Sequence, residues 1–121
     1  MRKFIALALL ALPMATSADY LDIWDYKLKD GCELSTHVQI VKDFNQWASE
    51  YGYRAEIAFS AFNSDMGLLR LLGRSKNATD NAQVWDAWVT ETADPDSVAG
   101  KLGARFDACQ IVLSRTAFDV L

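Results

Sequence analysis

The sequence is poor in the residue types that build metal centres and nucleophilic active sites. Its 121 residues include one histidine, His37, two cysteines, Cys32 and Cys109, and two prolines. No CxxC, HxxxH or HExxH spacing occurs, so a zinc site has no recognisable ligand set. We therefore expect no metal and no cofactor.

The chain also lacks a long apolar run. The longest one, residues 4–12, is shorter than the roughly 20 residues that cross a bilayer. It follows two basic residues and precedes small residues at positions 15–18, which is the pattern of a secretory signal peptide. We expect residues 1–18 to be cleaved after Ala18, and residues 19–121 to form a single domain in the periplasm or outside the cell. A membrane anchor is the alternative.

Clusters of basic residues are absent as well. The net charge is −4, and without residues 1–18 it becomes −6, because 10 basic and 16 acidic residues remain. Such a surface repels the phosphate backbone of nucleic acids, and no basic run would favour an anionic membrane. We expect neither nucleic acid as a partner nor a membrane span after signal cleavage.

Apolar periodicity predicts alternating strands and helices. The order is strand, helix, strand, strand, helix, strand, with a further short helix before the last strand. The predicted strands span residues 20–28, 54–62, 68–74 and 108–118. The predicted helices are one capped by Ser35 or Thr36 and ended by Gly52, one over 77–92 capped by Thr79 or Asp80, and one beginning near Pro95.

This order predicts an α+β, ferredoxin-like βαββαβ fold with an antiparallel four-stranded sheet. In that topology the last strand runs antiparallel beside the first, so Cys32 and Cys109 come together at one end of the sheet. An exported chain with two cysteines also favours a disulfide. We therefore predict a Cys32–Cys109 bridge.

The first strand and turn, YLDIWDYKLKDG, resemble the opening of NIPSNAP-like proteins and their relatives among the dimeric α/β barrels. The matching residues are Tyr26, Leu28, Lys29 and Gly31, whereas Asp30 replaces the usual proline, Trp24 the frequent arginine and Asp22 the frequent glutamate. The resemblance implies a homodimer in which two sheets pack face to face around a shared cleft.

Alternation within the strands predicts two unlike sheet faces. The apolar set, expected to pack on the helices, is Leu21, Ile23, Ile57, Phe59, Leu69, Leu71, Ile111 and Leu113. The mixed set, expected on the other face, is Asp22, Trp24, Tyr26, Glu56, Ser60, Leu68, Arg70, Leu72, Gln110, Val112 and Ser114. Such a mixed face suits a ligand cavity or an interface; an ordinary solvent-facing sheet surface is the alternative.

Several of these residues are candidates for binding: Asp22, Trp24, Tyr26, Glu56, Ser60, Arg70 and His37. An Asp22–Arg70 pair across neighbouring strands would orient a polar ligand or simply neutralise itself. His37 falls in phase with the packed face of the first helix, which favours a partly buried structural histidine over an acid–base or haem-ligating role. Export disfavours a catalytic thiolate at Cys32.

We consider three functions. The first is a binding module that takes a small amphipathic ligand or a protein partner on the mixed face. The second is a cofactor-poor monooxygenase or isomerase-like enzyme of the barrel superfamily, acting on an aromatic or quinone-like substrate through Asp22, Trp24, Tyr26, Arg70 or His37. The third is a structural or inhibitory partner protein.

Overall fold

The computed structural model describes residues 19–59 and 67–121. Along the chain it contains β1 (Tyr20–Leu28), α1 (Leu34–Ala48), a short 3₁₀ turn η1 (Ser49–Tyr51), β2 (Arg54–Phe59), β3 (Leu69–Ser75), α2 (Ala78–Thr92), α3 (Val98–Cys109) and β4 (Gln110–Asp119). The predicted order of elements is confirmed. The second strand was predicted to reach residue 62, and residues 60–62 lie outside the described part, as does Ser60 among the candidate site residues.

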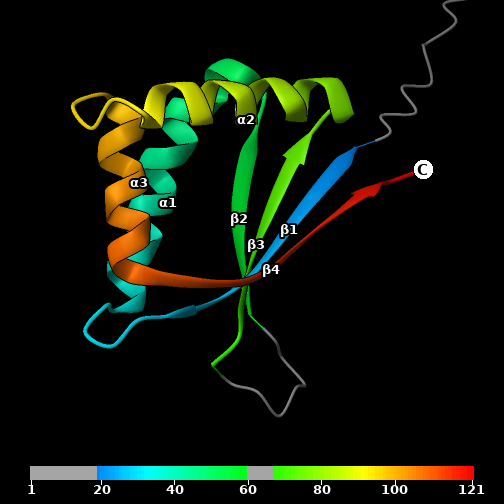
Figure 1. Ribbon diagram of the computed structural model, residues 1–121. Coiled ribbons are helices and arrows are strands. Elements are labelled where there is room, and N and C mark those ends of the chain that lie inside the picture. Colours follow the sequence, from blue (N-terminus) through cyan, green and yellow to red (C-terminus); the bar gives the residue numbers. More distant parts are fainter. Residues whose placement is uncertain (1–18, 60–66) are drawn as a thin grey trace, which may run out of the picture.

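The four strands form one antiparallel sheet in the order β2-β3-β1-β4. This is the ferredoxin-like arrangement that the sequence predicts. Figure 1 shows α1, α2 and α3 on the same face of the sheet, with α2 crossing one end. No helix of the described residues covers the opposite face. None of those helices has the length and apolarity that crossing a bilayer would need.

The core lies between the sheet and the helices. Helix α1 contributes His37, Ile40, Val41, Phe44 and Ala48, a spacing of three and four residues that places them on one side of the helix. Aromatic rings from α1, α2, α3 and the residue before β2 surround Phe44, including Trp85, Trp88 and Phe106. The α1 residues of this core form the buried side of the helix, at the three- and four-residue spacing from which apolar periodicity predicts a helix.

The helix caps differ from the predictions. Helix α1 begins at Leu34, and its N-cap Glu33 makes no side-chain capping bond, so neither Ser35 nor Thr36 is the cap. In α2 the cap is Asn77, whose side-chain oxygen accepts a hydrogen bond from the Asp80 backbone N–H at 2.8 Å. Gly52 ends the 3₁₀ turn that follows α1. Its φ of +68° is a left-handed conformation, which favours glycine.

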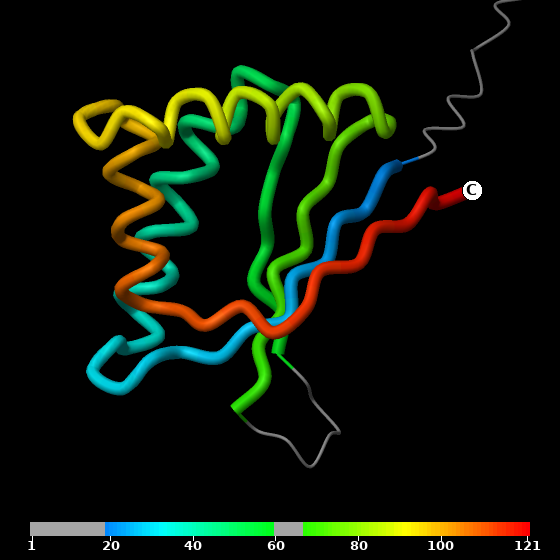
Figure 2. The backbone as a smooth tube through the Cα atoms, viewed as in Figure 1, coloured from blue at the N-terminus to red at the C-terminus, as the bar shows by residue number. Residues whose placement is uncertain are grey.

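The disulfide between Cys32 and Cys109 is present, 77 residues apart in sequence. Cys109 is the last residue of α3, whereas the sequence placed it in the strand that follows. The Lys29 backbone N–H donates to the Cys109 carbonyl at 2.8 Å, so the end of β1 meets the beginning of β4 beside the bridge. Figure 2 shows this meeting, with the loop after β1 passing below the end of α3.

The prediction of which side of β1 faces the helices is wrong. In the observed register Asp22, Trp24 and Tyr26 lie opposite Gly73, Leu71 and Leu69 of β3, all on the helix-covered face. Leu21 and Ile23 consequently face the other side. Both alternating sets of β1 residues contain large apolar side chains, so hydropathy does not show which set faces the helices. The contacts of Asp22, described below, show that its set does.

The predicted faces of β4 are partly wrong because the β1–β4 register shifts between Asp25 and Tyr26. Tyr26 lies opposite Val112 and Asp25 opposite Ser114, which leaves Leu113 as the extra residue of a β-bulge. Gln110 and Val112 before the bulge, and Arg115 and Ala117 after it, therefore face the helices. Ile111, Ser114, Thr116 and Phe118 face the other side.

Candidate functional site

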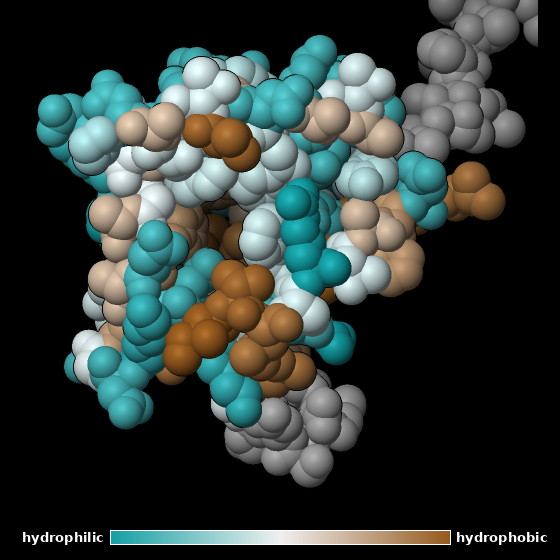
Figure 3. All heavy atoms as spheres, in the orientation of Figure 1, coloured by the Kyte–Doolittle hydropathy of each residue, from teal (hydrophilic) through white to brown (hydrophobic). Residues whose placement is uncertain are grey.

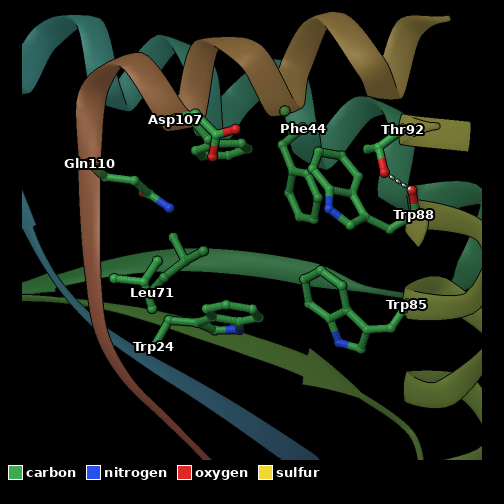
Figure 4. Close-up of a pocket in the computed structure, with 11 residues that line it drawn as sticks. Trp24, Phe44, Leu71, Trp85, Trp88, Thr92, Asp107 and Gln110 are labelled. Carbon is green, nitrogen blue, oxygen red and sulfur yellow. Dashed lines mark hydrogen bonds between the residues drawn. The ribbon is translucent and has the colours of Figure 1, made fainter. Parts of the chain in front are cut away.

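An open pocket of about 250 Å³ lies between the helix-covered face of the sheet and the three helices. Its walls are mainly aromatic and aliphatic, with Thr92, Asp107 and Gln110 as the polar members. The lining residues are Trp24, Phe44, Leu71, Trp85, Trp88, Thr92, Gly103, Phe106, Asp107, Gln110 and Val112. Figure 4 shows the indole rings of Trp24 and Trp85 forming one side and Trp88 and Phe44 the other. Ligand sites commonly combine apolar walls with a few polar groups in this way.

Behind one wall of this pocket, Asp22 holds a buried polar cluster. Its carboxylate has no solvent exposure, yet Arg115 donates to both oxygens at 2.9 Å. The Trp85 Nε1–H donates at 2.9 Å and the Tyr53 hydroxyl at 3.5 Å. These donors replace the water that a carboxylate loses on burial, which is why Asp22 is tolerated inside the fold.

Arg115 also stacks on the pocket wall. Its guanidinium carbon lies 4.5 Å from the centroid of the Trp24 ring and 4.7 Å from that of Trp85, a cation–π contact with each indole. The two indoles are 5.2 Å apart. Arg115 therefore ties the Asp22 carboxylate to the orientation of two residues that line the pocket.

Gly73 makes room for this cluster on β3. A Cβ atom at that position would collide with the hydroxyl and ring of Tyr53, whose side chain passes directly over it. Burial, and then the neighbouring Asp22 carboxylate, raise the pKa of Tyr53. Tyr53 is therefore a neutral hydrogen-bond donor to Asp22.

His37 stands on another side of the pocket, behind Gln110. The ring is fully buried and stacks on Tyr26 with centroids 4.7 Å apart. Its Nδ1 is 3.3 Å from the Tyr26 hydroxyl, and its Nε2 is 2.8 Å from Gln110 Oε1. Burial lowers the pKa of His37, partly opposed by the bond to Gln110.

This geometry bears on the roles considered for His37. Both ring nitrogens have partners and the ring has no exposed surface, so the residue does not present a free nitrogen to haem iron or to a substrate. The favoured structural role is consistent with these contacts, although the residue is fully buried where partial burial was expected. The described residues therefore do not fit a haem held by His37.

The remaining candidates within the described residues, Arg70 and Glu56, lie on the helix-free face of the sheet. Arg70 donates to Asp25 at 2.8 Å, and the Ser114 hydroxyl donates to the same carboxylate at 3.1 Å. The expected Asp22–Arg70 pair is therefore wrong, because Asp22 points to the opposite face. Glu56 is also on the helix-free face, 3.9–4.0 Å from Arg54 and Arg74.

The structure thus divides the predicted site residues. Trp24 lines the pocket, while Tyr26, His37 and Asp22 support its walls; Glu56 and Arg70 lie on the other side of the sheet. Sequence reasoning identified neither Arg115 nor Trp85 as a site residue. The available signal for Arg115 was a single charged residue within an otherwise uncharged segment, ACQIVLSRTAF.

Comparisons of the whole fold find solved structures with a similar fold. A NIPSNAP family protein of unknown function from Agrobacterium tumefaciens matches with a TM-score of 0.62 and 13% identity, over 86% of this chain and 89% of the other. A hydroxynitrile lyase from Passiflora edulis matches with a TM-score of 0.57 and 10% identity, over 87% and 95%.

A third match is a conserved protein of unknown function from Bacteroides thetaiotaomicron, described as a possible oxidoreductase. Its TM-score is 0.55 at 7% identity, over 85% of this chain and 98% of the other. No protein-family model and no curated protein matches the sequence. At such identities the likeness establishes a shared fold, and that fold agrees with the NIPSNAP-like resemblance of the first strand and turn.

Proposed function

We propose that the protein is an exported binding module that takes a small, flat, amphipathic molecule in the aromatic pocket. The observation that carries this proposal is the pocket itself, with three indoles around an open space that the core does not fill. Its volume of about 250 Å³ is slightly below the usual range for ligand sites, which suits a molecule of about two fused rings.

The lining favours binding over catalysis. Of the described residues around the pocket, only Asp107 carries a titratable side chain. The buried His37 and Tyr26 stand one layer behind Gln110 and have no direct access to a bound molecule. The enzymatic alternative would have to depend on Asp107, which belongs to the exposed end of α3.

Filling the pocket from within tests this proposal. Gly103 lies on α3 and faces Trp88 and Thr92 across ordinary contact distances, so Gly103→Leu places a branched side chain in the open space. Ala104→Leu is the matched control, because Ala104 is the next residue on the same helix and is exposed. The neutral dye phenylnaphthylamine reports binding by its fluorescence.

We expect the unmodified protein and Ala104→Leu to bind the dye alike, and Gly103→Leu to bind it at least tenfold more weakly. Equal binding by the two variants would show that the dye sits elsewhere and would overturn the proposal. Quenching of the indoles by the dye gives a second readout at the same site.

We also propose that two copies associate through the helix-free face of the sheet. Phe118 and Ile111 of β4 are about half exposed there, and Leu21 lies opposite Phe118. Figure 3 shows apolar side chains gathered over the first part of β4 as well. Exposed apolar groups beside paired charges such as Arg70–Asp25 are typical of an interface.

Light scattering tests the association directly. The protein is expected to run as a dimer, and Phe118→Asp as a monomer that keeps its far-ultraviolet circular dichroism. An exchange at an exposed position on the helix side, Val98→Asp, serves as the control and should leave the dimer intact. A monomeric parent protein would remove this part of the proposal.

A further inference from the structure

The polar end of the pocket is built to present a hydrogen-bond donor. Figure 4 shows the Gln110 side chain extending into the open space with its amide nitrogen at the tip. The amide oxygen is turned back and lies 2.8 Å from His37 Nε2. A glutamine amide has one accepting and one donating end, so fixing the oxygen fixes which end the ligand meets.

The proton positions in the hydrogen-bonded series Tyr26–His37–Gln110 indicate which way the Gln110 amide is turned. His37 is buried among uncharged neighbours, and burial lowers its pKa, so the ring carries one proton. That proton is on either Nε2 or Nδ1. With the proton on Nε2, the ring donates to Gln110 Oε1 and Nδ1 accepts the Tyr26 O–H.

The other tautomer leaves a buried donor without a partner. With the proton on Nδ1, the ring would donate to the Tyr26 oxygen, and the Tyr26 O–H would need a second acceptor. Within the described residues the only hydrogen-bond partner of that hydroxyl is His37. An unmet buried donor is costly, so Tyr26 selects the Nε2 proton. The hydrogen bonds then run in one direction, from Tyr26 to His37 to Gln110 to the pocket.

The charge at the pocket also limits the ligand. Asp107 lines the pocket three residues before Gln110, and Figure 4 shows its carboxylate at the same end. A ligand carboxylate close to Gln110 would be repelled by it, whereas an uncharged carbonyl would not. Indole walls add a preference for a planar ring system.

We propose that Gln110 is a specificity-determining residue that makes the pocket selective for a planar, uncharged carbonyl compound, such as an aromatic ketone or a quinone. Tyr26 and His37 are positioning residues that hold its amide donor toward the ligand. This inference rests on the proposed function, because it names the ligand class of the same pocket.

Three probes of similar shape separate the contributions of the hydrogen bond and of ligand charge to binding. Acetylnaphthalene carries the carbonyl oxygen, isopropenylnaphthalene replaces that oxygen with a carbon, and naphthoic acid is an anion at neutral pH. Affinities are measured by displacement of phenylnaphthylamine. The ketone is expected to bind roughly fivefold more tightly than the hydrocarbon, the ratio that one net hydrogen bond gives. Naphthoic acid should bind more weakly than the ketone and improve in Asp107→Asn.

Two substitutions change the donor without enlarging the pocket. Gln110→Met keeps the side-chain length and should abolish the preference for the ketone. Gln110→Glu turns a carboxylate oxygen toward the ligand and should make the ketone the poorer of the two uncharged probes. Gln83→Glu, at an exposed position on α2, adds the same charge away from the pocket and should leave the preference unchanged.

The chain offers an independent readout, because His37 is its only histidine. Nitrogen-15 NMR of the imidazole should show the proton on Nε2 in the parent protein, and a shift toward the Nδ1 tautomer in Tyr26→Phe. A proton on Nδ1 in the parent protein would overturn the proposal.

The binding outcomes distinguish this inference from the proposed function. If the dye binds but the ketone and hydrocarbon displace it equally, the donor role of Gln110 is wrong and the pocket proposal stands. If the dye binds and neither uncharged probe displaces it, the ligand class is wrong. If neither dye nor probes bind, both proposals fall.

Discussion

Replacing Arg115 with methionine removes a cation from the buried Asp22 cluster but keeps most of the apolar side chain that covers the two indoles. Asp22 would then be a fully buried carboxylate with only Trp85 and Tyr53 as donors. Removing one partner of a fully buried ion pair costs about 3–5 kcal/mol. Arg115 is 41% exposed and water screens its side of the pair, so we expect a loss of about 2–4 kcal/mol in the free energy of unfolding.

Arg70→Met is the matched comparison on the opposite face. Arg70 also donates to an aspartate at 2.8 Å, but its side chain is 54% exposed and Asp25 is partly exposed. Exposed ion pairs contribute about 0–1 kcal/mol, so this variant should lose at most that amount. Urea denaturation at neutral pH measures the two losses in the Phe118→Asp background, where no second copy covers Arg70, with equal m-values required for both variants.

The charge argument has its own control. In Asp22→Asn/Arg115→Met no buried charge remains, so the double variant should be more stable than Arg115→Met alone. If the double variant is no more stable, or if Arg70→Met costs as much as Arg115→Met, the burial of an unpaired carboxylate is not the reason for the loss. Arg115→Met should also weaken dye binding, because the Arg115 guanidinium stacks on two indoles that line the pocket.

Three further predictions concern stability. Gly103→Ala should raise the free energy of unfolding by about 0.5–1 kcal/mol, because a Cβ atom fits there and alanine favours helix; Gly100→Ala should lower it, because that Cβ would meet the Asp94 carbonyl. Because burial lowers the pKa of His37, the unfolded chain binds a proton on this histidine at a higher pH than the folded chain does. The stability that His37 contributes is therefore complete above about pH 6.5 and declines as the pH falls below it, by at most about 1.4 kcal/mol per pH unit. Cys32→Ala/Cys109→Ala should cost roughly 2–4 kcal/mol, since the bridge closes a loop of 77 residues.

Each of these predictions has a defined check. Thermal melts of the two glycine variants should move in opposite directions, and a shared direction would contradict the contact argument. The pH effect is the difference between the parent protein and His37→Gln at pH 7.5 and pH 5, and a difference that does not change would refute it. Reduction of the parent protein should reproduce the loss of stability seen in the double alanine variant.

The parts of the fold that the sequence predicted depend on local periodicity. The spacing of Ile40, Val41, Phe44 and Ala48 marks one side of α1 whatever surrounds it, and the order of elements then makes β1 and β4 neighbours. That adjacency is sufficient to bring Cys32 and Cys109 together. These results need only the short-range repeat of helix and strand and the small number of ways to arrange them.

The pocket could not be predicted in the same way because it depends on partners far apart in sequence. The side of β1 that is buried carries an aspartate, and its cationic partner among the described residues, Arg115, is 93 residues away. Alternation also assumes that a strand is regular, and β4 is not. Hydropathy assigns a charged residue to the surface, so it placed Asp22 with Arg70 when its partner lay across the other neighbouring strand.

The bulge at Leu113 has a consequence for recognising the same site in other chains. In a regular strand, residues on one face are separated by an even number of positions, yet Gln110 and Arg115, five apart, both face the helices. An odd interval between a glutamine and an arginine near the start of the last strand is therefore a sequence signature of this architecture. A relative that lacks one residue in that interval would need no bulge, because an even interval in a regular strand already keeps the arginine on the helix-covered face. A gap of a single position in an alignment would then mark the loss of the bulge and not the loss of the buried ion pair.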